Sequence, residues 1–214
     1  TNWGIQPENT RTITTEVAGI SSTNITKLMT KWAIAFPDSS RVRSQPTFAG
    51  DQIFVGSHSG IVYSLDRDTG CATWSFIASA EVRTGITYST SGPDPMVFFG
   101  DVIGNVYGLN ANTGEKMWRT RADDHPNATI TGTPSLNNNM LYVPVSSLEV
   151  SLAVNPDYEC CTFRGSVTAM NATTGEIQWK TFTIEEEPAV TGQNTVGTNI
   201  VGPSGAVVWN SPSI

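Results

Sequence analysis

The 214-residue chain is 38% hydrophobic and carries 12 basic and 19 acidic residues, a net charge of −7. This composition predicts a globular protein with a buried core, and no segment approaches the roughly 20 consecutive apolar residues of a membrane-spanning helix. The lack of a basic cluster argues against nucleic acid as a partner, and the spacing of the three cysteines matches no zinc, iron–sulfur or haem-attachment motif.

One pattern recurs three times along the chain, at 60–74, 104–118 and 165–179. Each copy has a glycine, nine residues, a second glycine, three residues and a tryptophan. The first part has the period-2 pattern of a strand and ends in an Asp or Asn turn that closes on Thr-Gly, whose glycine can adopt a positive φ. Each copy is therefore predicted to be a β-hairpin.

Another pair of short strands is predicted before each hairpin, so each repeat has the four strands of an antiparallel propeller blade. The repeat tryptophans are separated by about 40 to 60 residues, close to the roughly 40 to 50 residues of a blade. We predict an all-β chain in which residues 1–214 form a single partial β-propeller domain. Its blades are expected to end near Trp32, Trp74, Trp118 and Trp179, and a further blade to begin in the stretch up to Ile214.

These repeats resemble the PQQ-binding repeats of quinoprotein alcohol dehydrogenases, enzymes that use pyrroloquinoline quinone (PQQ). Other segments resemble the polyvinyl alcohol dehydrogenase branch in order and spacing: Asn2-Trp3-Gly4, Ser44-Gln45-Pro46, Phe54-Val55-Gly56-Ser57, Glu81-Val82-Arg83-Thr84, Val143-Pro144-Val145-Ser146-Ser147 and 160–166.

The resemblance implies about half of an eight-bladed propeller, with PQQ and Ca²⁺ as cofactors and an alcohol as substrate. It also implies a cytochrome or other electron acceptor as partner and a periplasmic or extracellular location. Because an open arc of blades leaves unpaired sheet edges, we expect further chain or self-assembly to close the ring.

Four residues lie three positions before the residue that opens each predicted innermost strand: Arg43, Arg83, Thr131 and Trp209. Equivalent positions in consecutive blades are expected to encircle one mouth of the channel. Two arginines suit a cofactor with three carboxylates, because a guanidinium pairs with a carboxylate through two hydrogen bonds; ordinary rim charges are the alternative. By resemblance, Trp209 matches the tryptophan on which PQQ lies flat, and packing between blades is the alternative.

Cys160 and Cys161 are adjacent, and neighbouring Cα atoms lie about 3.8 Å apart, below the usual disulfide range of roughly 4.4 to 6.8 Å. A bond between them therefore requires a distorted peptide. In the family that this chain resembles, such a pair covers the quinone opposite the tryptophan. Free buried thiols, or a bond from Cys71 to one of the pair, remain the alternatives.

Glu149 aligns by resemblance with the glutamate that binds the catalytic Ca²⁺, which prefers oxygen ligands; a solvated charge in a loop is the alternative. Ser146 and Ser147 precede it as cofactor-site candidates. Arg164 is expected either to contact a PQQ carboxylate or to form an ion pair with Glu149. The two histidines, His58 and His125, are expected in surface or turn roles.

No catalytic base is identified, because the aspartate of the family lies in blades beyond these residues. The alternative function is a propeller that keeps the repeats but serves as an interaction, assembly or polymer-forming module.

Overall fold

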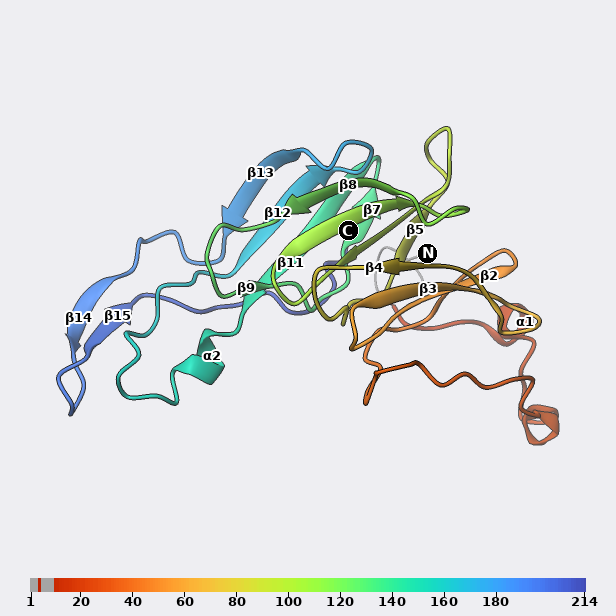
Figure 1. The fold of residues 1–214 in the computed structure, drawn as a ribbon, viewed down its shortest axis with the longest axis horizontal. Helices are drawn as coiled ribbons and strands as arrows, with labels where there is room; N and C mark the ends of the chain where they lie inside the picture. Colours follow the sequence, from red (N-terminus) through yellow and green to blue (C-terminus); the bar gives the residue numbers. More distant parts are fainter. Residues whose placement is uncertain (1–3, 5–9) are drawn as a thin grey trace.

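The computed structural model describes Gly4 and residues 10–214, so the Asn2-Trp3 part of the N-terminal motif lies outside the described residues. Its main feature is a set of four-stranded antiparallel sheets that lie side by side (Figure 1). This architecture confirms the predicted all-β, partial propeller. None of the helices in the described part of the chain is long and apolar enough to cross a bilayer.

The three complete blades follow one another along the chain, and in each the strands pair in sequence order. The first blade contains β1 (Thr47–Ala49), β2 (Gln52–Gly56), β3 (Ile61–Asp66) and β4 (Ala72–Ile77). The second contains β5 (Thr87–Ser89), β6 (Met96–Gly100), β7 (Asn105–Asn110) and β8 (Lys116–Arg121). The third contains β10 (Ser135–Asn137), β11 (Met140–Ser147), β12 (Ser166–Asn171) and β13 (Ile177–Phe182), and β9 (Ala128–Thr129) pairs with the end of β11.

The predicted Thr-Gly turns form through local contacts. In the first blade the Asp66 carboxylate accepts hydrogen bonds from the backbone N–H groups of Asp68 and Thr69 at 3.1 and 2.8 Å. Gly70 then closes the turn with a φ of 73°, a conformation that glycine adopts without a steric penalty. The second and third blades repeat this arrangement with an asparagine in place of the aspartate.

Three of the repeat tryptophans, Trp32, Trp74 and Trp118, each pack on the turn of the following blade. The indole N–H of Trp74 donates to the carbonyl of Ala111, and that of Trp118 donates to the carbonyl of Ala172, both at 2.9 Å. Trp32 makes the same bond to the carbonyl of Arg67. These three tryptophans therefore join neighbouring blades.

A second set of contacts joins the blades at their innermost strands. The hydroxyl of Thr47 donates to the carbonyl of Ile86 at 2.6 Å, and the hydroxyl of Thr87 donates to the carbonyl of Pro134 at 2.5 Å. The hydroxyl of Ser135 donates in the same way to the carbonyl of Pro212 at 2.5 Å. The stretch that contains Pro212 thus occupies the place of a fourth innermost strand.

Two buried clusters fill the spaces between the blades. Phe54 and Val62 of the first blade pack with Val97 and Phe99 of the second. Phe98 of the second blade packs with Leu141 and other residues of the third. The hydrophobic core therefore lies between the blades, and its packing fixes the positions of the innermost strands around the propeller axis.

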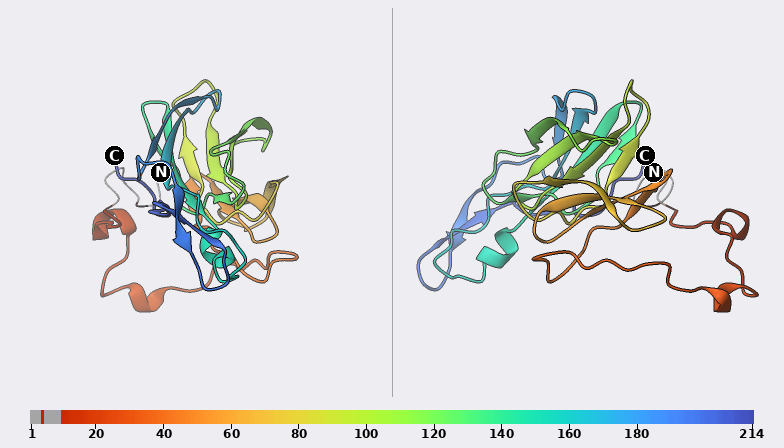
Figure 2. Two further views of the ribbon diagram at one scale, coloured as in Figure 1. Left: turned by 90° about the vertical axis from the view of Figure 1, so that its left-hand side faces the viewer. Right: turned by 45° about the vertical axis from the view of Figure 1, so that its right-hand side comes forward.

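Several elements were not predicted. Helix α2 (Glu149–Leu152) and a hairpin formed by β14 (Ala189–Gln193) and β15 (Asn199–Gly202) project from one end of the blades (Figure 1). An N-terminal arm with α1 (Thr15–Ala18) and the short 3₁₀ helix η1 (Ile25–Lys27) runs along the opposite side (Figure 2). Neither segment carries the repeat pattern.

Candidate functional site

The four residues predicted to encircle one mouth of the channel, each just before an innermost strand, lie on the wall of one cavity. Arg43, Arg83, Thr131 and Trp209 all line a space of about 450 Å³. Arg43, Thr131 and Trp209 make no hydrogen bond or ion pair with the part of the chain that the structure describes. These groups are therefore available to a ligand, and the two arginines give the wall a positive charge.

A second cavity of about 590 Å³ adjoins the first, because Thr131 and Trp209 line both. Its volume falls within the roughly 300 to 1,000 Å³ of small-molecule sites. Its wall also includes Ser146, Ser147, Glu149 and Cys161. Trp209 is 68% exposed, so it does not pack between blades and can offer a ring face to a ligand.

Arg83 is held in place by a carboxylate. Its Nη2 atom donates to Glu81 at 2.9 Å, and Arg41 and His58 approach the same carboxylate at 3.7 and 3.9 Å. Burial raises the pKa of Glu81, but the hydrogen bond and charge of Arg83, with His58 and Arg41, outweigh it and lower that pKa overall. The Nε atom of Arg83 is buried and has no partner among the described residues, so this side chain has a donor to spare.

Cys160 and Cys161 are bonded to each other and their peptide is cis. Backbone hydrogen bonds fix the pair to β15: the N–H of Cys161 donates to the carbonyl of Val201 at 3.2 Å, and the N–H of Val201 donates to that of Cys160 at 2.8 Å. Cys71 is free and exposed. The alternative of a bond from Cys71 is therefore not the pairing that forms, and Cys161 reaches the same cavity as Trp209.

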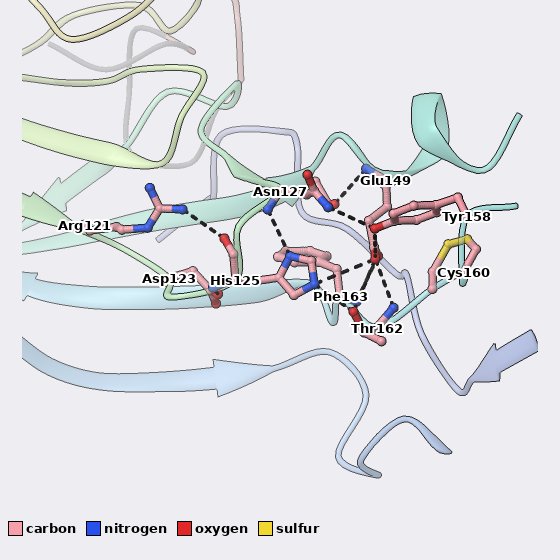
Figure 3. Close-up of polar contacts among 11 residues, drawn as sticks. Arg121, Asp123, His125, Asn127, Glu149, Tyr158, Cys160, Thr162 and Phe163 are labelled. Atoms are coloured by element: carbon pink, nitrogen blue, oxygen red, sulfur yellow. Dashed lines mark hydrogen bonds and ion pairs between the residues drawn. A yellow bond between two sulfur atoms is a disulfide. The ribbon is translucent and has the colours of Figure 1, made fainter. Parts of the chain in front are cut away.

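Glu149 lies at the start of α2, on the side of Tyr158 and Thr162, with its side chain only 4% exposed (Figure 3). Its Oε1 atom accepts hydrogen bonds from the Tyr158 hydroxyl at 3.0 Å and from the N–H and hydroxyl of Thr162 at 3.1 and 3.3 Å. Its Oε2 atom accepts a hydrogen bond from the N–H of Phe163 at 2.9 Å. The carboxylate is thus surrounded by donors from the disulfide loop.

This environment does not fit an open calcium ligand. A carboxylate offers about four lone-pair positions, and the protein donors around Glu149 occupy most of them. Among the described residues, no three acidic, His or Cys side chains are grouped around a possible metal position, so most of the roughly six to eight oxygen ligands of a Ca²⁺ ion would have to be groups of other kinds. The predicted calcium site at Glu149 therefore does not match the arrangement of these donors.

Arg164 is not brought together with the other predicted residues. It lines a separate cavity of about 340 Å³ and forms an ion pair with Glu187 at 2.9 Å. Its guanidinium also lies 4.1 Å from the centre of the Phe182 ring. The ion pair expected between Arg164 and Glu149 is thus not the one that forms, and Arg164 lines neither of the two cavities beside Trp209.

Three contributors were missed from the sequence. Arg11 lines the cavity with the two other arginines, but it lies outside every repeat and no pattern pointed to it. The Thr129 hydroxyl is buried without a hydrogen-bond partner among the described residues and lines the second cavity; it lies in β9, which was not among the predicted strands. His125 has the expected turn role, since its Nδ1 atom accepts a hydrogen bond from the N–H of Asn127, but the approach of its Nε2 atom to within 3.7 Å of Glu149 was not predicted.

A family model described as outer membrane protein assembly factor BamB, the PQQ_2 model, matches residues 14–157 and 58–212 of the chain. The polyvinylalcohol dehydrogenase of a Pseudomonas species is 36% identical over 92% of this chain and 31% of its own length. That of Sphingopyxis sp. strain 113P3 is 37% identical over 89% of this chain and 30% of its own length. The chain thus spans about a third of the length of these relatives.

Solved structures show the same fold. A europium-containing methanol dehydrogenase matches with a TM-score of 0.59 at 23% identity, over 76% of this chain and 28% of its own. The quinohemoprotein alcohol dehydrogenase of Comamonas testosteroni matches with a TM-score of 0.55 at 21% identity, over 68% and 22%. The chain therefore belongs to the PQQ_2 family of repeat proteins, and its resemblance to the quinoprotein alcohol dehydrogenases, polyvinyl alcohol dehydrogenases included, is confirmed.

Proposed function

We propose that this chain supplies the PQQ site of an oxidoreductase that oxidises alcohol groups. The observation that carries the proposal is the placement of Trp209 and Cys161 on the walls of the second cavity, which adjoins the first cavity and its arginines. The named activities of the relatives, which are dehydrogenases of polyvinyl alcohol and other alcohols, support it.

The residues present fit PQQ. An exposed indole face, such as that of Trp209, gains dispersion and ring-stacking energy from a flat aromatic ligand. Arg43 and Arg83 can pair with carboxylates through two hydrogen bonds each, and the Nε atom of Arg83 lacks a partner among the described residues. Thr131, Ser146 and Ser147 add hydroxyl groups to the walls. When bound, PQQ supplies a quinone that accepts the two electrons removed from the alcohol.

We do not assign calcium binding to Glu149, because donors of the protein itself occupy that carboxylate. Arg164 is not assigned to the PQQ site either, since it forms an ion pair with Glu187. The catalytic base is placed outside these 214 residues. A cytochrome or similar acceptor is proposed because several relatives are named quinohemoproteins.

We place the protein in the periplasm or outside the cell, where disulfides such as Cys160–Cys161 persist. Because the named relatives are about three times as long, we propose that further blades, or another copy of the chain, close the ring. The blades would then end near Trp32, Trp74, Trp118 and Trp179, as the repeats indicate.

Reconstitution tests the activity. The full-length protein is mixed with PQQ, with and without Ca²⁺, and reduction of an artificial electron-accepting dye is followed with primary, secondary and polymeric alcohols. We expect dye reduction that requires both PQQ and an alcohol. Dye reduction that is absent under every condition, although PQQ binds, contradicts the catalytic proposal.

The alternative is a non-catalytic propeller that acts as an assembly or interaction module, which the BamB description of the matching family model favours. It predicts that PQQ neither binds nor changes the stability of the protein. Thermal unfolding with and without PQQ separates the two functions, because a ligand that binds only the folded state raises the melting temperature.

A further inference from the structure

The Glu149 carboxylate accepts its hydrogen bonds from residues that flank the disulfide in sequence. Three of its four donors come from Thr162 and Phe163, the two residues that directly follow Cys160–Cys161. The fourth comes from Tyr158, two residues before the disulfide. A single buried carboxylate therefore collects hydrogen bonds from both sides of the disulfide.

The donors are themselves fixed in position (Figure 3). The side-chain amide of Asn127 donates to the Tyr158 oxygen at 3.0 Å, and the His125 ring lies 2.9 Å from the Thr162 hydroxyl. Burial, followed by the hydrogen bond to Glu149, raises the pKa of Tyr158. The phenol therefore stays protonated and remains a donor at neutral pH.

The opposite side of the loop is held by the β14–β15 hairpin. Val201 forms the two backbone bonds to the cysteines. The side chain of Asn194 donates to the carbonyl of Pro156 at 2.7 Å, and that of Asn199 donates to Glu159 at 3.3 Å. The disulfide thus lies between a surface hairpin on one side and the buried carboxylate of Glu149, just after β11, on the other.

We propose that Glu149 is a positioning residue: its carboxylate anchors the Cys160–Cys161 loop at the cavity shared with Trp209, and while so engaged it is not an open ligand for a divalent cation. This inference rests on the proposed PQQ site and deepens it, since it assigns to this chain's glutamate the task of placing the wall of that site. It differs from the calcium role that the resemblance implies for the same residue.

Hydrogen exchange at the amides of Thr162 and Phe163 tests the anchor directly in the cofactor-free, full-length protein. Glu149→Gln removes the charge and puts an amide group among N–H donors. Because hydrogen bonds to a charged acceptor are lost, we expect hydrogen exchange to accelerate about tenfold to a hundredfold at both amides. Asp157→Asn is the matched control, because it removes the same charge from the same loop at an exposed side chain, and its exchange rates should stay close to wild type.

The disulfide provides a second readout. The rate of its reduction by dithiothreitol, followed by alkylation and mass spectrometry, should rise in Glu149→Gln more than in Asp157→Asn. Equal exchange and reduction rates in the two variants would overturn the anchor.

Tyr158→Phe covers the case in which Glu149→Gln does not fold. It removes one donor and keeps the ring, and exchange at Thr162 should accelerate several-fold while exchange in β12 is unchanged. Exchange at Thr162 that stays at the wild-type rate would also overturn the proposal.

Calcium chloride alone distinguishes the anchor from a metal ligand. We expect no change in exchange at Thr162 and Phe163 when it is added to the wild-type protein. A calcium-induced change that Glu149→Gln abolishes would show that the carboxylate is an open ligand and overturn the proposal. Binding of PQQ is measured in parallel. If PQQ does not bind, the proposed function is refuted, whereas the anchoring role of Glu149 is judged from the exchange rates alone.

Discussion

Replacement of Trp118 by alanine tests the contact that joins the second and third blades. Trp118 is only 8% exposed, its N–H donates to the carbonyl of Ala172 at 2.9 Å, and its ring stacks on Phe98 with the centroids 5.9 Å apart. The ring also lies so close to Gly175 that a Cβ there would come within 2.5 Å of the indole. Trp118→Ala therefore removes packing against two elements at once.

The expected cost follows from these contacts. Replacing a buried Trp or Phe by Ala destabilises a protein by about 3 to 5 kcal/mol. Ala172 is 3% exposed, and leaving its carbonyl unpaired accounts for about 1 to 3 kcal/mol of that loss. Trp118→Phe should recover most of the packing but not the hydrogen bond, so its cost should be smaller.

Urea unfolding followed by circular dichroism measures these changes as shifts in the free energy of unfolding. The matched control is Met117→Ala, one residue away in β8, where the side chain is 55% exposed; its effect should stay below about 1 kcal/mol. Comparable losses in Trp118→Ala and Met117→Ala would refute the interblade role assigned to the repeat tryptophan.

Three further predictions concern the fold and the site. Gly175→Ala should destabilise the protein by at least about 1 kcal/mol in the same unfolding assay, because its φ is 73° and a Cβ would meet Trp118; an effect within error would contradict this. Because the folded-state pKa of Glu81 is lowered, its stabilising ion pair is present at neutral pH and is lost as the pH falls below about 4. The difference in unfolding free energy between wild type and Glu81→Gln should therefore shrink over that range. A difference that grows on acidification would exclude the ion pair. Arg83→Gln and Arg43→Gln should each weaken PQQ binding by about tenfold at low salt and by less at high salt, as measured by titration calorimetry; equal losses at both salt concentrations would argue against carboxylate pairing.

The blades could be predicted because their determinants are local. An Asp or Asn side chain, a glycine with positive φ and a tryptophan recur within 15 residues, and the hairpin turns form from these same residues. The alignment of Trp209 with Arg43, Arg83 and Thr131 was also predictable, because the position of each residue relative to the innermost strand is the same in every blade. The cavity confirms that these four lie together.

The remainder of the site depends on contacts that no local pattern encodes. The β14–β15 hairpin supports the disulfide through Val201, about 40 residues away in sequence. The position of Arg11 is set by the N-terminal arm, which has no repeat. Resemblance suggested metal binding for Glu149 and a cofactor contact for Arg164, but the insertion that carries the cysteines brings its own donors to Glu149, and Arg164 pairs with Glu187.

Binding of PQQ to the full-length protein, measured by titration calorimetry in wild type and Trp209→Ala, tests the central claim most directly. Trp179→Ala is the control, since Trp179 is 44% exposed but lines a different cavity. The account predicts that PQQ binds to the wild type and to Trp179→Ala alike, and at least about tenfold more weakly to Trp209→Ala because the stacking surface is lost. Wild-type protein that does not bind PQQ, or equal affinity in Trp209→Ala, would contradict it.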